Sequence, residues 1–275
     1  MLNFKEKLKN KKILIYGFGK TGRSCFNFLN KNNKITIYDD NHKILPNKIK
    51  KYYFSNKNSI KKNSYEHIVI SPGIDIKKCN LKSFLSSNKN KIITDLDLFY
   101  FKNIKNTKIT ITGTNGKSTT SKLLYEILKR HKKNVKLIGN IGSPVLNQKA
   151  KNSKTIFVVE ASSYQIEYSK YYKTDYSMIL NISPDHLERH KTMKNYVKAK
   201  FKLIKNQKKD GYAYITKDNK YLKKILLNTK KKPKIIFVNF RNIKNIKNSI
   251  VNPYFKKINN LQNLSFIMEI SKKLG

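Results

Sequence analysis

The chain is poor in several residue types, and each shortage excludes some classes of protein. Only two of its 275 residues are cysteine. Cys25 and Cys79 lie in unrelated contexts without a metal-binding or redox spacing, which is typical of a reducing compartment. No apolar run approaches the ~20 residues that span a bilayer. The run Ile13–Tyr16 is also too short for a signal-peptide core. We therefore expect a cytoplasmic protein without a membrane partner.

Acidic residues and arginine are scarce too. Sixty basic residues face 16 acidic ones, giving a net charge of +44, which would ordinarily indicate a nucleic-acid partner. Only four of the basic residues are arginine, whereas surfaces that read bases favour its planar fork. We interpret the scattered lysines as solvated positions filled from a biased codon pool, and we expect no nucleic-acid partner. The alternative, a nucleic-acid-stimulated ATPase, predicts activation by DNA or RNA with a steep salt dependence.

Strand and helix patterns alternate along the chain, which predicts an α/β fold on mostly parallel sheets. The length allows one large or two medium domains. We expect an N-terminal Rossmann-like domain over residues 1–94 and a central phosphate-loop ATPase-type domain over residues 95–275, with a break near Ile92–Phe99. The expected strands are Lys12–Tyr16, Ile35–Tyr38, His67–Ile70, Lys108–Thr112, Val135–Ile138, Thr155–Val159, Tyr176–Ile182, Tyr212–Thr216 and Ile235–Val238. Helices are expected over Tyr221–Leu227 and Asn259–Leu274.

The most informative motif is the glycine turn between strand Lys108–Thr112 and the helix that follows. Gly113-Thr114-Asn115-Gly116-Lys117-Ser118-Thr119 is shorter than the usual G-x-x-x-x-G-K-[ST] loop, because Ile111 stands where the first glycine is expected. Free backbone N–H groups at the start of a helix favour a phosphate. The lysine could reach the β/γ oxygens and Ser118 could ligate Mg²⁺. We interpret this loop as an ATP site.

A second glycine motif lies near the N-terminus. Gly17-x-Gly19-x-x-Gly22 joins a strand to a helix, and the next strand ends at Asp39, about 20 residues on. This is the fingerprint of a dinucleotide or nucleotide-sugar pocket. Ser71-Pro72-Gly73 forms a turn at the carboxyl edge of the same predicted sheet, where ligands bind in open α/β folds. The alternative is that the glycines only allow close helix–strand packing.

Polar side chains also follow three strands of the second predicted sheet. Glu160 ends an apolar strand, where a lone buried carboxylate would be costly, so a cation such as Mg²⁺ is the economical partner. Asn140 follows another strand end, and Asp185 and His186 follow a third, beside Glu160 if those neighbouring strands pair. His190 is expected to be a surface or capping residue.

Together these motifs resemble the Mur ligase family. The residues that carry the resemblance are Thr112–Thr119, Gly139–Gly142, Glu160-Ala-Ser-Ser-Tyr-Gln165, Asn181–His190 and Asn195–Lys200, extended by the N-terminal glycine fingerprint and Ser71–Gly73. The resemblance implies a reaction in which ATP converts the carboxylate of a muramoyl peptide into an acyl phosphate, which the amine of an amino acid then attacks. Among family members it favours the ligase that adds D-glutamate to UDP-N-acetylmuramoyl-L-alanine in peptidoglycan synthesis. We expect a monomer.

The resemblance also implies roles for individual residues. Gly113, Thr114, Asn115, Gly116, Lys117, Ser118 and Thr119 would bind ATP, and Lys117, Glu160, His186 and Lys200 would be catalytic. One Mg²⁺ would lie on Ser118 and Glu160, and a second on His186 and Lys200, which matches a lysine that CO₂ carbamylates in the family. The substrate-binding residues would be Gly17, Phe18, Gly19, Lys20, Thr21, Asp39, Ser71, Pro72, Gly73, Asn140, Ser162 and Gln165.

Two departures from the family pattern bear on function. In the part of the family pattern that contacts the uracil of the substrate, Asp40-Asn41 stands where many relatives have Thr-Arg. In a later helix with the family pattern H-N-x-x-N, Asn259 stands where relatives have histidine. The resemblance implies a further domain after that helix, with the amino-acid pocket and half of the ATP contacts, and we expect this chain to lack it. We therefore expect this chain to bind its ligands without efficient ligation, as a truncated ligase would. The alternatives are another Mur ligase, such as the L-alanine-adding one, and a nucleotide-sugar or ATP-binding module without ligase activity.

Overall fold

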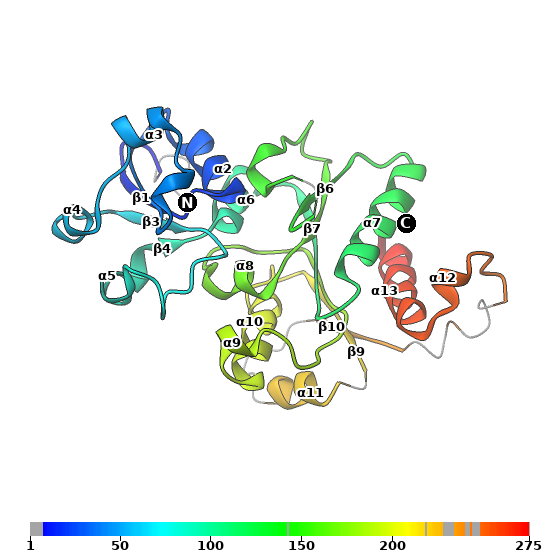
Figure 1. Cartoon of the computed structure of the whole chain (residues 1–275). Coiled ribbons are helices and arrows are strands. Elements are labelled where there is room, and N and C mark those ends of the chain that lie inside the picture. The colour runs from blue at the N-terminus through cyan, green and yellow to red at the C-terminus, as the bar shows by residue number, and fades with distance from the viewer. Residues whose placement is uncertain are drawn as a thin grey trace. The chain divides into compact units, whose positions relative to one another are not determined.

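A computed structural model of the chain describes residues 8–141, 143–217, 219–227, 234–239, 243 and 248–274, with the side chains of Ile44 and Tyr52 left out. Gly142 of the Gly139–Gly142 motif lies outside the described residues. The chain divides into two compact units (Figure 1). The first comprises Met1–Ile104, Pro144–Lys149 and Tyr168–Tyr172, and the second comprises Lys105–Ser143, Ala150–Glu167 and Lys173–Gly275. The domain boundary at residue 94 stays a prediction.

The first unit is built on a parallel four-stranded sheet of order β2-β1-β3-β4. Its strands are β1 (Lys12–Tyr16), β2 (Lys34–Tyr38), β3 (His67–Ile70) and β4 (Ile92–Ile93). Its helices are α2 (Lys20–Leu29), α3 (Asn47–Tyr52), α4 (Lys57–Lys62), α5 (Lys82–Ser87) and α6 (Asp95–Lys102), with 3-10 turns at His42–Ile44, Lys89–Lys91 and Val145–Asn147. The stretch expected only as a break therefore contains an edge strand and a helix.

One buried carboxylate, that of Asp97, joins two separate segments of the first unit. Asp97, fully buried in the first turn of α6, accepts the backbone N–H of Thr94 at 2.9 Å in a capping box. It also accepts the backbone N–H groups of Lys170, Tyr171 and Tyr172 at 2.7–2.9 Å. Burial raises the pKa of this carboxyl, while the backbone donors oppose the rise. One side chain therefore ties a distant segment to α6.

The second unit is built on a parallel six-stranded sheet of order β10-β9-β8-β5-β7-β6. Its strands are β5 (Thr107–Thr112), β6 (Val135–Gly139), β7 (Ile156–Glu160), β8 (Tyr176–Ile179), β9 (Tyr212–Thr216) and β10 (Lys234–Val238). Its helices are α7 (Lys117–Arg130), α8 (Ser163–Tyr168), α9 (Leu187–His190), α10 (Met193–Lys205), α11 (Lys220–Leu227), α12 (Pro253–Lys256) and α13 (Ile258–Leu274). The predicted α/β class with mostly parallel sheets is confirmed.

Helices cover both faces of this second sheet, which explains why its strands are apolar almost throughout. On one face α7 and α13 lie side by side (Figure 1), and their Leu124 and Ile267 pack with Ile111 of β5. On the other face α10 and α11 place Phe201 and Leu222 against β8 and β9. Among the described residues, no helix combines the length and apolar character needed to cross a bilayer.

The strand predicted over Tyr176–Ile182 is wrong at its end, because β8 stops at Ile179. The Leu180 N–H still donates to the Thr112 carbonyl at 3.0 Å, but the next carbonyl, that of Asn181, accepts from the Thr114 N–H at 3.1 Å. The chain thus leaves the strand ladder in order to bond the loop that follows β5.

Gly139 offers a test of how tightly β6 and β7 approach. Its φ is +113°, and an added Cβ would lie 2.1 Å from the Glu160 carbonyl oxygen. Gly139→Ala is therefore expected to lower the free energy of unfolding by about 2 kcal/mol or more, through backbone strain and this overlap. Urea denaturation measures the change. The matched control is Gly73→Ala, where nothing lies within 4 Å of the added carbon. Equal stability of the two variants would contradict the prediction.

Candidate functional site

The order of the central strands determines where the glycine loop lies. β5 pairs with β7 on one side and with β8 on the other, so β7 and β8 are not neighbours. The expectation that Glu160 and His186 follow adjacent strands is therefore wrong. Because carboxyl ends of parallel strands meet at one edge of a sheet, the loop Gly113–Gly116 lies between the end of β7, at Glu160, and the segment that follows β8.

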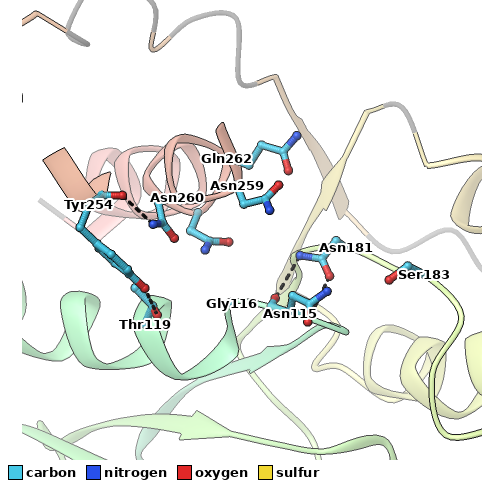
Figure 2. A pocket seen from close by; sticks show the side chains of 10 residues that line it. Asn115, Gly116, Thr119, Asn181, Ser183, Tyr254, Asn259, Asn260 and Gln262 are labelled. Carbon is cyan, nitrogen blue, oxygen red and sulfur yellow. Dashed lines mark hydrogen bonds between the residues drawn. The ribbon is translucent and has the colours of Figure 1, made fainter. Parts of the chain in front are cut away.

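The segment after β8 holds the loop in place. Asn181 Oδ1 accepts the Asn115 N–H at 2.9 Å, and Asn181 Nδ2 donates to the Asn115 carbonyl at 3.0 Å (Figure 2). The Thr114 hydroxyl accepts the Ser183 N–H at 3.1 Å and lies 3.1 Å from the Tyr196 hydroxyl. Gly116, with φ +80°, then leads into α7. These bonds hold the loop in one conformation at the helix N-terminus.

Two lysines meet at the start of this loop. Lys117 Nζ donates to the carbonyl oxygens of Gly113 at 2.9 Å and Thr114 at 2.6 Å. Lys200 Nζ, from α10, donates to the same Gly113 carbonyl at 2.8 Å and lies 4.7 Å from the Tyr196 ring centroid. Lys200, which the sequence would otherwise place on a solvated helix face, is only 1% exposed.

Burial changes the acid–base behaviour of both lysines. Burial, reinforced by the charge of Lys117 and opposed by that of Asp185, lowers the pKa of Lys200 to about 7. Burial also lowers the pKa of Lys117, while Glu160 and Asp185 oppose that fall. Asp185 thus favours the charged form of both lysines, and Glu160 favours that of Lys117. Near neutral pH, Lys200 is therefore divided between its charged and neutral forms.

The carboxylate of Glu160 is fully buried at the end of β7. Its Oε1 accepts from Asn140 Nδ2 at 2.9 Å, and the Asn140 N–H donates to the Glu160 carbonyl at 2.9 Å. Its Oε2 has no hydrogen-bond partner in the described part of the chain. An orphaned buried carboxylate oxygen beside a phosphate-type loop fits a hard cation such as Mg²⁺. Ser118, the other expected ligand, is exposed in the first turn of α7.

His186 has a left-handed backbone, with φ +53°. Its Nε2 lies 3.4 Å from Asp185 and its Nδ1 lies 3.6 Å from Glu188. Its ring lies 4.9 Å from that of Tyr164 on α8, the helix that begins just after Glu160. A non-glycine residue in this conformation is uncommon and often marks a functional segment. Considering only the described residues, no three His, Cys, Asp or Glu side chains form a metal-binding group.

Other predicted residues near Glu160 bond one another. Gln165 Oε1 accepts the Ser162 N–H at 3.1 Å, and the Gln165 N–H donates to Ser162 Oγ at 3.3 Å, at the start of α8. His190 was expected at the surface but is 2% exposed, with Nε2 3.0 Å from Ser163 Oγ. Burial lowers the pKa of His190 to about 4, so this ring is a neutral core group.

A pocket of about 380 Å³ opens beside the glycine loop (Figure 2). Asn115, Gly116 and Thr119 line it from the loop and α7. The remaining lining residues come from the segment after β8, α12 and α13, and none of them was predicted to bind a ligand: Asn181, Ser183, Tyr254, Asn259, Asn260, Gln262 and Asn263. The signal that could have found them is the density of amides in Asn259–Asn263. Such side chains suit the edge of a purine base.

The first unit brings its two predicted loops together at the carboxyl end of β1. Strand order reverses there, because β2 pairs on one side of β1 and β3 on the other. Ser71 Oγ donates to the Gly17 carbonyl at 2.8 Å, and a Cβ on Gly17, with φ +90°, would lie 2.8 Å from that of Ser71. Ligands bind at such switch points in open α/β folds. Pro72 and Gly73 continue the second loop.

Asp39 connects the glycine loop to β2 and is itself buried. Its carboxylate accepts the Phe18 N–H at 2.6 Å and the Asn41 N–H at 2.9 Å. The loop then passes through Gly19 to Lys20 and Thr21, the first residues of α2. The unusual Asp40 accepts the hydroxyl of Tyr16 at 2.7–2.8 Å. The Asp40 carboxylate, which departs from the family pattern, is therefore held by a side chain of β1.

Comparison with known families agrees with this geometry. Residues 111–271 match the Mur ligase middle domain, and residues 11–93 match the N-terminal domain described as Mur ligase MurD-like. The chain belongs to the Mur ligase family. The two matches cover the glycine loops of both units.

Several curated relatives within the Mur ligase family carry the same name. UDP-N-acetylmuramoylalanine–D-glutamate ligase of Rickettsia bellii (strain RML369-C) is 37% identical over 97% of this chain and 59% of its own length. The ligase of the same name from Caldicellulosiruptor saccharolyticus is 37% identical over 77% of this chain and 49% of its own length. The chain thus spans about half the length of the curated relatives it matches.

Solved structures of the Mur ligase family share the fold at low identity. A murein peptide ligase from Psychrobacter arcticus covers 97% of this chain and 66% of its own, with a TM-score of 0.54 and 13% identity. A UDP-N-acetylmuramate:L-alanyl-γ-D-glutamyl-meso-diaminopimelate ligase from Neisseria covers 82% of this chain and 77% of its own, with a TM-score of 0.52 and 14% identity. At this identity the likeness supports the fold alone.

The pKa of Lys200 leads to a prediction for stability. Below pH 7 its ammonium is charged in both states, whereas between pH 7 and its ordinary value of 10.5 only the unfolded chain holds the proton. The free energy of unfolding should therefore rise with pH in this window, by about 2 kcal/mol between pH 7 and 9 from Lys200 alone. Lys200→Met should lose this increment in bicarbonate-free denaturant titrations.

Lys198→Met is the control for this experiment, because Lys198 is exposed on the same helix. It should retain the wild-type rise in stability with pH. An equal slope in wild type and Lys200→Met would contradict the prediction.

Proposed function

We propose that this chain carries the ATP and nucleotide-sugar sites of a ligase that joins D-glutamate to UDP-N-acetylmuramoyl-L-alanine. The observation that carries the proposal is the cluster at the glycine loop, where Lys117 and Lys200 donate to the same Gly113 carbonyl and the fully buried Glu160 has one oxygen without a partner in the described part of the chain. The shared name of the relatives supports the choice of substrate. We propose the complete ligation reaction on the basis of these relatives, which are about twice as long as this chain.

The chemistry explains why these groups are needed. A carboxylate resists attack by an amine until one of its oxygens becomes part of a leaving group. Transfer of the γ-phosphoryl group of ATP to the substrate carboxylate forms an acyl phosphate, and attack by the amine of D-glutamate then releases phosphate. Because the first step brings two anions together, cationic groups must neutralise the charge. We assign this role to Lys117 and the N–H groups of Gly113–Thr119, which would bind the triphosphate.

The donors present also fit Mg²⁺. Ser118 and Glu160 would hold one ion, and His186 together with a carbamylated Lys200 would hold a second. Bound there, Mg²⁺ would supply positive charge beside the phosphates. Asn140 holds Glu160 by a 2.9 Å hydrogen bond, so its contribution includes positioning that carboxylate. We place the muramoyl part of the substrate near Asn140, Ser162 and Gln165.

The first unit would bind the uridine diphosphate. Gly17–Thr21, Asp39 and Ser71–Gly73 surround the carboxyl end of β1, where strand order reverses. Gly19 has open space where a side chain would begin, so a phosphate could approach its backbone closely. The second candidate function is a binding module that holds both nucleotides without completing ligation.

Glu160→Gln tests the metal assignment. Loss of one carboxylate charge should weaken Mg²⁺-dependent ATP binding roughly tenfold or more, because a ligand at the ion is lost. Binding of ATP in EDTA should change little. Isothermal titration with and without Mg²⁺ measures both affinities.

Glu126→Gln on α7 is the control and should bind as wild type. An unchanged Mg²⁺ effect in Glu160→Gln would argue against the site. A panel of radiolabelled amino acids with UDP-linked muramoyl substrates then separates the candidates. D-glutamate incorporation supports the proposed ligase, L-alanine incorporation the L-alanine-adding relative, and binding without incorporation the module.

Carbamylation of Lys200 can be tested directly. With a pKa of about 7, about nine in ten of its amines are unprotonated at pH 8, the form that attacks CO₂. Wild-type protein in ¹³C-bicarbonate should show a carbamate signal by NMR that Lys200→Arg lacks.

Lys108→Arg is the matched control, because burial also lowers the pKa of fully buried Lys108 to about 7, yet Lys108 lies near the start of β5, whereas the glycine loop follows the end of that strand. The signal should persist in this variant. A wild-type spectrum without a carbamate signal would contradict carbamylation.

A further inference from the structure

Tyr254 combines firm anchoring with an exposed ring. Its backbone N–H donates to Asn252 Oδ1 at 3.0 Å, and its carbonyl accepts from Asn260 Nδ2 at 2.7 Å. Its hydroxyl lies 3.3 Å from Thr119 Oγ1 on α7. The side chain nevertheless remains 47% exposed. Residues anchored at three points are usually buried, so this tyrosine is held in place without being used to fill the core.

The pocket beside the glycine loop has an unusual lining. Tyr254 is its only aromatic side chain among the described residues, and the others are amides, hydroxyls and Gly116. No charged side chain lines the pocket in that part of the chain. Figure 2 shows Tyr254 reaching from α12 towards Thr119, on the side of the pocket away from Asn181 and Ser183.

A nucleobase offers two kinds of surface, polar edges and apolar faces. Amides match the edges by paired hydrogen bonds, whereas the faces need a flat aromatic or apolar partner. The pocket supplies many amides and a single ring. We propose that Tyr254 is the stacking residue for the base of the nucleotide whose phosphates bind the Gly113–Thr119 loop. This inference rests on the proposed ATP site and adds to it the residue that recognises the base.

The anchoring of Tyr254 follows from this role. Thr119 lies in the first turn of α7, within the loop motif that would hold the phosphates, and its hydroxyl contacts that of Tyr254. Asn260 lines the pocket and also holds the Tyr254 carbonyl. The ring is therefore fixed relative to both the loop and the amides, so a base could stack with little loss of side-chain freedom.

The chain contains no tryptophan, which allows a direct test. Tyr254→Trp introduces a single indole at the proposed stacking position. ATP and ADP should quench its fluorescence on binding, whereas tripolyphosphate, which has no base, should not. Phe237→Trp is the matched control, because Phe237 on β10 is 50% exposed and does not line the pocket. Its fluorescence should not change with any of the three ligands.

Affinity variants complete the experiment. Tyr254→Ala should weaken ATP binding roughly tenfold and leave tripolyphosphate binding unchanged, as expected for one stacked base. Tyr254→Phe keeps the ring and should bind ATP within about twofold of wild type, while thermal unfolding confirms that each variant is folded.

The outcomes separate two possible failures. Wild-type affinity for ATP in Tyr254→Ala, or quenching of Tyr254→Trp by tripolyphosphate alone, would overturn the stacking role while leaving the ATP site intact. Failure of wild-type protein to bind either ATP or tripolyphosphate would overturn the proposed ATP site itself, and the stacking role with it.

Discussion

Two lysine ammonium groups donate to one carbonyl oxygen, that of Gly113, and the rest of the site is arranged around this repulsion. Burial and mutual proximity depress the pKa of Lys200, and burial depresses that of Lys117. Of the groups that act on the two lysines, Glu160 and Asp185 are the ones that raise these pKa values. The loop is thus prepared for an anion, since added negative charge would relieve a strain that the protein alone compensates only in part.

The strand order makes this arrangement possible. Placing β5 between β7 and β8 puts the loop between a buried carboxylate on one side and a chain segment free to bond it on the other. Asn181 pairs with both backbone groups of Asn115 because β8 ends early and releases that segment from the sheet. A loop held by these bonds can keep its N–H groups free for a phosphate, and the helix start has no side-chain cap.

The residue types that are rare or abundant in this chain lie at particular places in the structure. Carboxylates are rare in this chain, and three of the buried ones hold structure or lie at the site: Asp39 supports the first glycine loop, Asp97 accepts from four backbone donors, and Glu160 keeps one oxygen unpaired. Asparagine is abundant, and its amides line the pocket beside the phosphate loop. Lysine is also abundant, but we assign site roles to few lysines, and among these burial lowers the pKa of Lys117 and Lys200.

Local patterns in the sequence were enough to predict the α/β class, most strand positions and both glycine loops, because periodicity and turn chemistry depend on residues a few positions apart. They could not place β5 between β7 and β8, bury His190 against Ser163, or bring Tyr254 and α13 to the loop. These features arise from pairing between segments far apart in the chain. Such pairing depends on which apolar faces cover one another, so it is determined by the tertiary packing around the sheet and not by the local sequence.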